Sequence, residues 1–437
     1  MTTSECTNGT KKLHFVIVGG SLGGLATGIA LKALGHDTTI LERNATPLLH
    51  DQGAGIVAGG HSLEFLERYN RCQRQVAVPS EKRQYLDKQG NIVHSVDAAH
   101  NMSSWDLTYF LLRANYDGIS SPYCDVPPID PTHGAAVHLH DRTVTGVVPS
   151  DDDNGVVVSW KSTSNPSLTG TMTADRLVGA DGPSSFIRSL FAPGLERTYA
   201  GYCALRGTVP ENEATPSTRN LFANRFTFYH GPGIQILAYL IPGLHGTVEP
   251  GQRLINFVYY TNFPANSAEL DEILTDKNGR RHRITLPPGL TDPVAWKRQQ
   301  EIARQVLPPP FAEIVGKAKR PFVQAVTDVI SPANEFLNGK VVLIGDALAG
   351  FRPHTVASTS QAAYDAMVYA DYIAGIITRE KWKRMTMGYA RFIQKRGVEM
   401  GDRSQHQRLA LEEYIRDRDE ASVPIREDMF PDWATRI

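Results

Sequence analysis

Residues 13–43 read LHFVIVGGSLGGLATGIALKALGHDTTILER, and this stretch decides the fold class. It begins with an apolar, largely β-branched run at residues 15–18, as expected for a parallel strand that is buried on both faces. A glycine-rich turn follows, then an apolar segment at residues 25–34 with the composition of a helix, and then a second strand-like run. The order strand, tight turn, helix, strand predicts the first βαβ unit of an α/β domain.

The glycine spacing is typical of a nucleotide-binding turn. Gly19, Ser21 and Gly24 occupy the three positions of the pattern G-x-G-x-x-G, with serine in place of the middle glycine. That glycine lets the backbone approach a pyrophosphate, and serine is its smallest polar replacement. Glu42 lies 18 residues after Gly24, where an acidic residue binds ribose hydroxyls and favours FAD or NAD over NADP. The alternative is a glycine-rich turn in some other α/β protein.

Two later segments repeat the pattern of a strand that ends in a carboxylate. ADRLVGADGPSSFIRSLF (residues 174–191) ends an apolar run at Asp181, and LIGDALAGFRPHTVAS (residues 343–358) ends one at Asp346. A helix-like run, STSQAAYDAMVYADYI, follows the second segment. Each alone could be a plain turn, because Asp, Gly and Pro are ordinary loop residues. A carboxylate at a strand end can also accept a hydrogen bond from a sugar-like hydroxyl.

Together the three segments resemble those of the group A FAD-dependent aromatic monooxygenases, which have the para-hydroxybenzoate hydroxylase-type fold. The resemblance extends over about residues 12–377 and includes YAGYCALRG, which is similar to the family's Y-x-G-x-x-x-W-R-G with Leu205 in place of Trp. The segment GAGI, residues 53–56, also matches. The tetrapeptide RPHT is similar to the 2,6-dihydroxypyridine hydroxylase branch and to fungal 4-hydroxybenzoate 1-hydroxylase-like enzymes.

The resemblance implies an enzyme with FAD as cofactor and NADPH or NADH as co-substrate. It implies that one oxygen atom from O₂ enters a phenolic or heteroaromatic substrate through a flavin C4a-hydroperoxide. If the substrate is a 4-hydroxybenzoate-like acid, attack at the carboxyl-bearing carbon would expel CO₂ and give a hydroquinone. Two alternatives stay open: oxygenation of an indole or polyketide in secondary metabolism, and a non-oxygenating flavin reductase or electron carrier. The sequence has no second dinucleotide pattern, so reduced nicotinamide is expected to bind transiently.

The predicted cofactor-binding residues lie in or beside these motifs. Asp346 is expected to bind the ribityl chain of FAD. Pro353 presets the first turn of a helix whose N–H groups, from about Thr355 onward, are expected to face the flavin. The complete prediction comprises Gly19, Ser21, Gly24, Glu42, Arg43, Gly55, Arg113, Asp181, Asp346, Pro353, Thr355, Val356 and Ala357.

The predicted catalytic residues are His50, His354 and Tyr229. Phenolate is a far better carbon nucleophile than phenol, so a base beside the substrate hydroxyl would help. Both histidines lie in loops next to cofactor motifs, and the ordinary pKa of histidine is near the working pH. The predicted substrate-binding residues are His230, Tyr239, Tyr259 and Pro353. Plain sheet packing is the alternative for each tyrosine.

The fold class predicted is α/β, with a Rossmann-like FAD-binding domain, an inserted antiparallel-sheet substrate domain and a C-terminal helical segment. The FAD-binding domain is expected to be discontinuous, and a hairpin with its turn at residues 89–91 is assigned to the substrate domain. Residues 262–293 are polar and are expected to form a loop. The helical segment is interpreted as a peripheral helix or a homodimer contact. The predicted boundaries are 1–75, 101–197 and 331–380 for the FAD-binding domain, 76–100 and 198–330 for the substrate domain, and 381–437 for the helical segment.

The composition is that of an ordinary globular protein, with 437 residues, 41% hydrophobic and 21% charged. A formal net charge of -1 provides no basic field for nucleic acid. No apolar run approaches the length of a membrane span, and the N-terminus has no signal-like apolar core, so the predicted location is cytoplasmic. The four cysteines form no C-x-x-C and are interpreted as reduced thiols. His138 and His140 could pair on a metal, but the resemblance makes HLHD an ordinary strand, and no metal is predicted.

Overall fold

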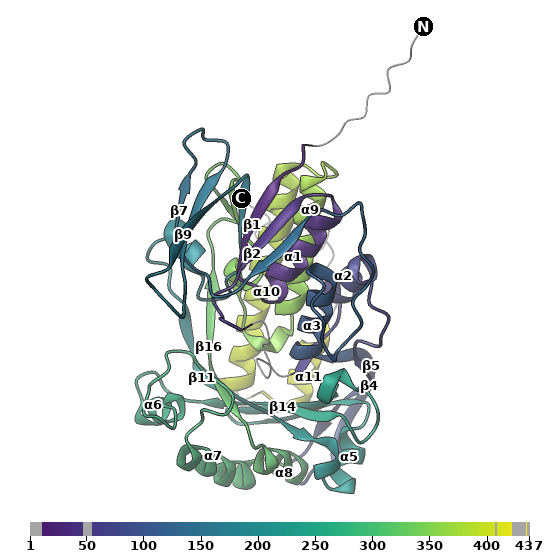
Figure 1. The fold of residues 1–437 in the computed structure, drawn as a ribbon. Coiled ribbons are helices and arrows are strands. Elements are labelled where there is room, and N and C mark those ends of the chain that lie inside the picture. The colour runs from purple at the N-terminus through teal and green to yellow at the C-terminus, as the bar shows by residue number, and fades with distance from the viewer. Residues whose placement is uncertain (1–10, 47–54, 407–408, 422–433, 435–437) are drawn as a thin grey trace.

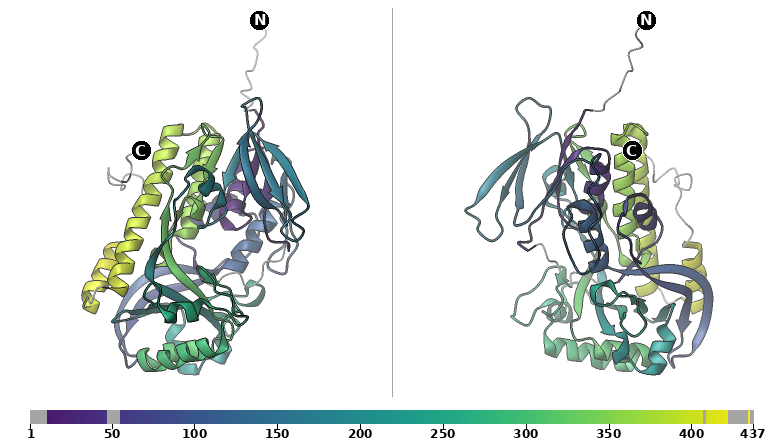
Figure 2. Two further views of the ribbon diagram at one scale, coloured as in Figure 1. Left: turned by 90° about the vertical axis from the view of Figure 1, so that its left-hand side faces the viewer. Right: turned by 45° about the vertical axis from the view of Figure 1, so that its right-hand side comes forward.

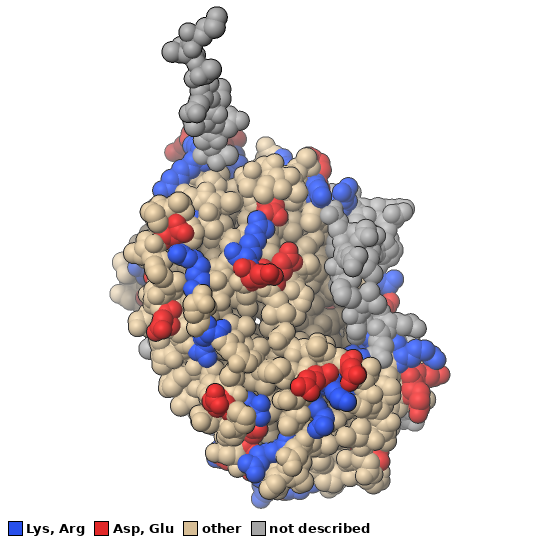
Figure 3. Space-filling view, turned by 90° about the vertical axis from the view of Figure 1, so that its right-hand side faces the viewer, with Lys and Arg blue, Asp and Glu red and all other residues tan. Residues whose placement is uncertain are grey.

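The computed structural model describes residues 11–46, 55–406, 409–421 and 434. The first sheet and its helices occupy the upper part of Figure 1, and a second, larger sheet with its helices occupies the lower part. On the face shown in Figure 3, acidic and basic side chains are interspersed. Among the described helices, none combines the length and apolar character needed to cross a bilayer.

The first sheet has six strands in the order β17-β18-β10-β1-β2-β6. Every neighbouring pair is parallel except β17 and β18. Phe15, Val16 and Ile17 of the first strand have no exposed surface, in agreement with the predicted strand that is buried on both faces. The strands are β1 (His14–Val18), β2 (Asp37–Leu41), β6 (Ala136–Leu139), β10 (Arg176–Gly179), β17 (Glu335–Phe336) and β18 (Val341–Leu343).

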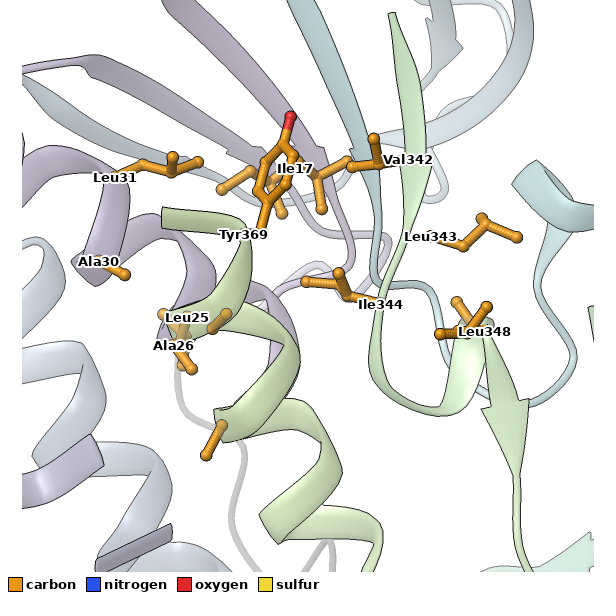
Figure 4. Packing of buried hydrophobic residues seen from close by; sticks show 14 of the residues in the cluster. Ile17, Leu25, Ala26, Ala30, Leu31, Val342, Leu343, Ile344, Leu348 and Tyr369 are labelled. Atoms are coloured by element: carbon orange, nitrogen blue, oxygen red, sulfur yellow. The ribbon is translucent and has the colours of Figure 1, made fainter. Parts of the chain in front are cut away.

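Helices α1 (Leu22–Ala33) and α9 (Ser358–Ile373) pack against each other on one face of this sheet. Figure 4 shows part of this apolar cluster, in which the Tyr369 ring of α9 lies beside Ile17 of β1, and Leu25 of α1 lies next to Ala26. Further helices here are α2 (His61–Tyr69), α3 (Trp105–Tyr116) and α4 (Phe186–Phe191). A separate three-stranded sheet, β7 (Thr143–Pro149), β8 (Val156–Lys161) and β9 (Thr169–Ala174), projects beside the domain (Figure 2).

The second sheet has ten strands, with β15-β16-β11-β14-β13-β12-β4-β5-β3 as its main path and β19 paired to β16. The predicted hairpin, β4 and β5, joins this sheet through parallel pairing of β4 with β12. The strands of the second sheet are β3 (Gly55–Val57), β4 (Val78–Leu86), β5 (Ile92–Ser104), β11 (Thr198–Pro210), β12 (Arg225–Gly231), β13 (Ile234–Ile241), β14 (Leu254–Asn262), β15 (Thr285–Leu286), β16 (Phe322–Ile330) and β19 (Ala349–Gly350).

One face of the large sheet is covered by helices, and the other faces the first domain. Alternate residues of β11, β13 and β14 enter two separate apolar clusters, as the two-residue period of a strand requires. The cluster with Leu205, Ile236 and Tyr259 includes side chains of the covering helices. These helices are α5 (Pro216–Phe222), α6 (Ala268–Leu274), α7 (Pro293–Val306) and α8 (Pro309–Lys317).

Two sequence-based predictions of local structure were wrong. The stretch 262–293 is not simply a loop: it contains α6, which Ser267 caps by accepting a hydrogen bond from the Leu270 N–H. The helix-like run STSQAAYDAMVYADYI forms α9, as predicted, but the helix begins at Ser358 and does not include the first turn expected from Pro353 and Thr355. A short 3₁₀ turn, η4 (Pro353–Thr355), precedes it, and Val356 lies in the left-handed region with φ of 50°. Left-handed backbone interrupts the helix at this point.

The C-terminal segment is helical, as predicted. Helix α10 (Arg379–Gln405) packs along α9 and runs down one side of the molecule (Figure 2), and α11 (Leu411–Ala421) follows. Arg352 connects this helix to the large sheet, because its guanidinium pairs with Asp328 of β16 and with Asp402 of α10, each at 2.7 to 2.8 Å. The loop that carries RPHT is therefore held from both sides.

The tight turn after β1 leads to a stability prediction. A Cβ added at Gly24 would lie 1.9 Å from the Gly19 carbonyl oxygen, which belongs to the backbone and cannot rotate away. We expect Gly24→Ala to lower the free energy of unfolding by about 1–3 kcal/mol or more, as overpacking does. Gly316→Ala is the matched control, since no atom lies within 4 Å of its added Cβ in α8. Urea denaturation measures the effect, and equal unfolding midpoints for Gly24→Ala and Gly316→Ala would contradict the expectation.

Candidate cofactor and substrate site

A cavity of about 420 Å³ lies between the first domain and the uncovered face of the large sheet. One side is formed by the segments that follow β1, β10 and β18, including Ser21, Gly182 and Asp346. The other side is formed by side chains of β11, β13, β14 and β16. These are Arg206, Leu237, Tyr239, Val258, Tyr260, Phe322, Gln324, Val326 and Thr327.

The turn between β1 and α1 is shaped for close approach of an anion. Gly19 has φ of 105°, and a Cβ there would lie 2.4 Å from the Ala180 carbonyl oxygen, so only glycine fits. Ser21 is the N-cap of α1, but its side chain does not cap the helix, and the first turn holds no acidic residue. The first N–H groups of α1 and its dipole can therefore bind phosphate oxygens at the cavity wall.

Glu42 lies at the end of β2, where the spacing predicted it. Its carboxylate is buried and accepts hydrogen bonds from the Gly20 N–H at 2.7 Å and the Asn44 N–H at 2.8 Å. Two backbone donors thus fix its position outside the residues that line the cavity, while lone pairs stay available for ribose hydroxyls. Arg43 is exposed, and its carbonyl accepts a hydrogen bond from the Thr163 hydroxyl at 2.7 Å.

The structure does not support Arg113 as a cofactor ligand. This arginine is buried on α3, where it pairs with Asp117 at 2.8 Å and donates to the Tyr109 hydroxyl at 2.7 Å. It does not line the cavity. Asp117, one helical turn away, already neutralises the charge of Arg113, so this ion pair stabilises the C-terminal end of α3.

Asp346 faces the cavity with an unsatisfied oxygen. Its Oδ1 atom is buried and has no hydrogen-bond partner among the described residues. Burial raises the pKa of this carboxyl to about 6, although the nearby Arg197 guanidinium acts to lower it. A buried acceptor without a donor is costly, and a hydroxyl of a sugar-like chain would satisfy it. This observation fits the predicted ribityl contact.

The backbone that carries Asp346 is fixed by α9. Gly345 has φ of 56°, its N–H donates to Asp365 Oδ2 at 2.8 Å, and its carbonyl accepts from Gln361 Nε2 at 3.1 Å. Burial raises the pKa of Asp365 well above its ordinary value. Asp181 has a different role from Asp346, since its carboxylate accepts from the Phe186 and Ile187 N–H groups and caps α4. Gly182, beside Asp181, lines the cavity instead.

The RPHT turn presents backbone and small side chains to the cavity. Pro353, Val356 and Ala357 line it, and the Thr355 hydroxyl oxygen is buried without a partner among the described residues. The start of α9 has no side-chain cap and no acidic residue in its first turn. It is therefore free to stabilise negative charge on a bound ring system. Gly55 also lines the cavity, and a Cβ there would lie 2.5 Å from the Tyr239 ring.

His354 does not line the cavity, so the structure does not support it as a base that touches substrate. It is buried, and both ring nitrogens are engaged: Nδ1 with Gln235 Oε1 and Nε2 with the Tyr202 hydroxyl, each at 3.0 Å. Because Gln235 Oε1 can only accept, Nδ1 carries the proton and Nε2 accepts from Tyr202. Burial lowers the pKa of His354 to about 3, so the ring is neutral, as expected. The competing candidate, His50, lies outside the described residues.

Strand alternation separates the predicted substrate residues. Tyr239 lines the cavity. Tyr229 and Tyr259 pack in the cluster on the helix-covered face of the sheet, and so they cannot contact a ligand in the cavity. His230 does not line the cavity either, because its ring stacks on Tyr414 of α11 at 4.2 Å. For Tyr229 and Tyr259 the packing alternative therefore holds.

On the large sheet, sequence reasoning identified Tyr239 and missed the other cavity-lining residues, among them Arg206, Tyr260 and Gln324. The signal was present in the two-residue period of the strands, since Tyr260 and Arg206 each neighbour a residue of the covered face. His138 and His140 stack on each other at 4.3 Å, and the described residues contain no cluster of three or more metal-ligating side chains. Cys72, Cys124 and Cys203 are free thiols.

The sequence is similar to those of known FAD-binding proteins. The family described as FAD binding domain-like matches residues 199–328. The chain is 29% identical over 359 residues to 2,6-dihydroxypyridine 3-monooxygenase of Paenarthrobacter nicotinovorans, covering 82% of each protein. It is 24% identical over 394 residues to the FAD-dependent monooxygenase sor5 of Hypocrea jecorina (strain QM6a), covering 84% of this chain and 76% of that one.

The fold is also similar to solved structures. The structure of 2,6-dihydroxypyridine-3-hydroxylase from Arthrobacter nicotinovorans matches with a TM-score of 0.77 and 26% identity, covering 91% of this chain and 94% of that chain. HpxO of Klebsiella pneumoniae, complexed with FAD and uric acid, has the same fold at 17% identity, with a TM-score of 0.67 and coverage of 94% and 95%. The glycine-rich turn, the unsatisfied Asp346 and these similarities support an FAD-dependent monooxygenase, as the resemblance to the group A FAD-dependent aromatic monooxygenases implies.

Proposed function

We propose that the chain uses NADPH or NADH and O₂ to insert one oxygen atom into a phenolic or heteroaromatic substrate. The observation that carries this proposal is that a single cavity contains both the cofactor motifs and an aromatic wall. Tyr239, Tyr260 and Phe322 supply that wall from the large sheet. Apolar and aromatic walls with a few polar groups are typical of sites for small aromatic ligands.

The proposed roles follow from the geometry of the described residues. When bound, FAD supplies the redox and oxygen chemistry. The first turn of α1 would hold its pyrophosphate, Glu42 its ribose and Asp346 its ribityl chain. The start of α9 would stabilise negative charge on its ring system. Tyr239, Tyr260 and Phe322 place the substrate ring and exclude water, which protects reactive intermediates from side reactions.

The substrate proposal is tested by a screen of phenolic acids and dihydroxypyridines. Each compound is added to the holoenzyme with NADH or NADPH while nicotinamide oxidation, O₂ consumption and product mass are followed. We expect at least one compound to stimulate all three, with a product that gains one oxygen atom. Replacement of a carboxyl group by hydroxyl would identify decarboxylative hydroxylation. Product formation without O₂ consumption would contradict the proposal in favour of a flavin reductase.

Asp346 gives a prediction about cofactor affinity. Asp346→Ala removes an acceptor for a ribityl hydroxyl, and loss of a hydrogen bond to a charged group costs about 1.5–3 kcal/mol. We therefore expect FAD to bind about 10- to 100-fold more weakly, measured by titration of the apoprotein. Asp151→Asn, in the exposed turn between β7 and β8, is the control. An unchanged dissociation constant for FAD in Asp346→Ala would contradict this role and make Asp346 an ordinary loop residue.

The raised pKa of Asp346 also predicts a pH dependence. In the protein without cofactor the carboxyl has a pKa of about 6, so it is protonated at pH 5 and ionised at pH 7. A hydroxyl donor favours the ionised form and lowers that pKa, which means that FAD binding releases a proton. We expect FAD affinity to rise between pH 5 and pH 7. Asp346→Asn should flatten this rise, and a rise that persists would assign it to another group.

His354 is predicted to act mainly on stability. His354→Ala empties a buried site and leaves the Tyr202 hydroxyl and Gln235 Oε1 without their partner. We expect the free energy of unfolding to fall by about 2–4 kcal/mol. Tyr202→Phe, which removes one hydrogen bond, should cost about 1 kcal/mol. Hydroxylation per folded holoenzyme should fall less than the roughly hundred-fold typical of a lost general base. His50→Ala is measured in parallel as the competing base.

A further inference from the structure

A second, smaller cavity adjoins the large one, and we call it the side chamber. It lies between α1, α2, α3 and the first turns of α9, and its volume is about 30 Å³, against about 420 Å³ for the large cavity. The two cavities share four lining residues: Leu22, Ile56, Thr359 and Ala362. The side chamber is therefore next to the wall where the first turns of α1 and α9 are proposed to meet FAD.

The lining of the side chamber is apolar. Four of its described lining residues carry hydroxyl groups, and three of these are engaged elsewhere. Ser103 and Thr108 each donate to a backbone carbonyl, at 2.6 Å and 2.9 Å, and the Ser62 hydroxyl oxygen lies 3.2 Å from that of Ser360. The fourth is Thr359, at the boundary with the large cavity. A buried water needs two to four polar partners, so this lining favours an apolar occupant over water.

The volume of the side chamber restricts that occupant further. A space of about 30 Å³ holds roughly two water-sized particles, since one such particle needs about 10–15 Å³. Sites for ring-sized ligands typically have about 300–1,000 Å³, so an aromatic substrate belongs in the large cavity. A small apolar gas molecule satisfies both the size and the polarity of the chamber. O₂ is such a molecule, and the proposed reaction consumes it.

The position of the side chamber gives this occupant a use. In the proposed function, an aromatic ring occupies the large cavity while O₂ reacts with the reduced flavin. A chamber that opens beside the cofactor, and that the ring is too large to enter, remains available to the gas during that step. Leu22 and Ile56 mark the boundary, because both of them line the two cavities.

We propose that the side chamber binds O₂ and supplies it to the flavin across the boundary with the large cavity. The inference deepens the proposed function and rests on it for the use of O₂. It assigns a role to apolar side chains of α1, α2 and α3 that contact neither of the proposed polar binding groups, Glu42 and Asp346.

The first arm of the test measures gas binding without turnover. Crystals of the holoenzyme are pressurised with xenon, which binds in dry apolar cavities, and xenon is located by its anomalous scattering. We expect xenon in the side chamber of the parental protein. Ala26→Val adds carbon atoms to a lining side chain and should exclude it. Ala30→Val is the matched control, because Ala30 is buried one turn further along α1 and is not among the described lining residues.

The second arm measures the reaction with O₂ and needs no aromatic substrate. Holoenzyme is photoreduced without oxygen and mixed with O₂-containing buffer in a stopped-flow instrument, and the second-order rate constant of flavin reoxidation is determined. We expect Ala26→Val to lower this constant at least about threefold and Ala30→Val to leave it unchanged. Xenon pressure should slow reoxidation of the parental protein relative to argon at equal pressure, and it should not slow Ala26→Val further. Anaerobic reduction of the flavin by dithionite should proceed equally in both variants.

The outcomes are separable. The inference is overturned if xenon does not enter the side chamber, or if it enters while Ala26→Val reoxidises at the parental rate, which would make the chamber an adventitious gas site. Flavin content and far-ultraviolet circular dichroism show whether Ala26→Val has lost its fold. In that case Ala58→Leu, which fills the chamber from the segment between β3 and α2, decides. If reoxidation depends on the chamber but no aromatic compound ever gains oxygen, the gas site stands and the proposed function fails.

Discussion

Parallel pairing of β1, β10 and β18 is the constraint on which the site depends. Val18 is in register with Gly179, and Gly179 with Leu343, so three strands from distant parts of the chain end at the same edge. The segments that follow them must then meet, as the loops at the carboxyl ends of a parallel sheet do. This brings the turn after β1, Gly182 and Asp346 to one cavity wall. Burial of the strands stabilises the fold, and the same register assembles the cofactor side of the site.

The second constraint is the alternation of side chains in the large sheet. Leu205 pairs with Tyr259, and Arg206 pairs with Val258, so Leu205 and Tyr259 share one face while Arg206 and Val258 share the other. The covering helices decide which face is closed. The Leu205 that replaces the family's tryptophan lies on the closed face, where any apolar side chain of suitable volume can pack. This departure from the motif therefore leaves the cavity unaffected.

How far the sequence predicts this molecule depends on the range of the interactions involved. The strand, turn and helix of residues 13–43 follow from local composition, and so does the position of Glu42. The opposite faces on which Tyr239 and Tyr259 lie do not follow from local composition. Alternation divides the residues of a strand into two sets, but it does not say which set is covered by helices. The environment of His354 also escaped prediction, since its partners Tyr202 and Gln235 come from two other strands. The sequence indicated a reactive histidine in a loop, whereas the tertiary contacts of His354 make it a buried structural residue.

Unsatisfied polar groups that line the cavity lower the stability of the empty protein. Among the described residues, Asp346 Oδ1 has no hydrogen-bond donor on the cofactor side, and the Arg206 side chain has no acidic partner on the substrate side. By contrast, the charges of Glu211 and Arg253 are both satisfied, because the two side chains pair at 2.7 Å. Two unsatisfied groups of opposite charge at two walls of one cavity are an expensive arrangement for a chain that has only to fold. Under the proposed function, Asp346 would gain a hydroxyl donor when FAD binds, so a group that weakens the empty protein would contribute to cofactor affinity.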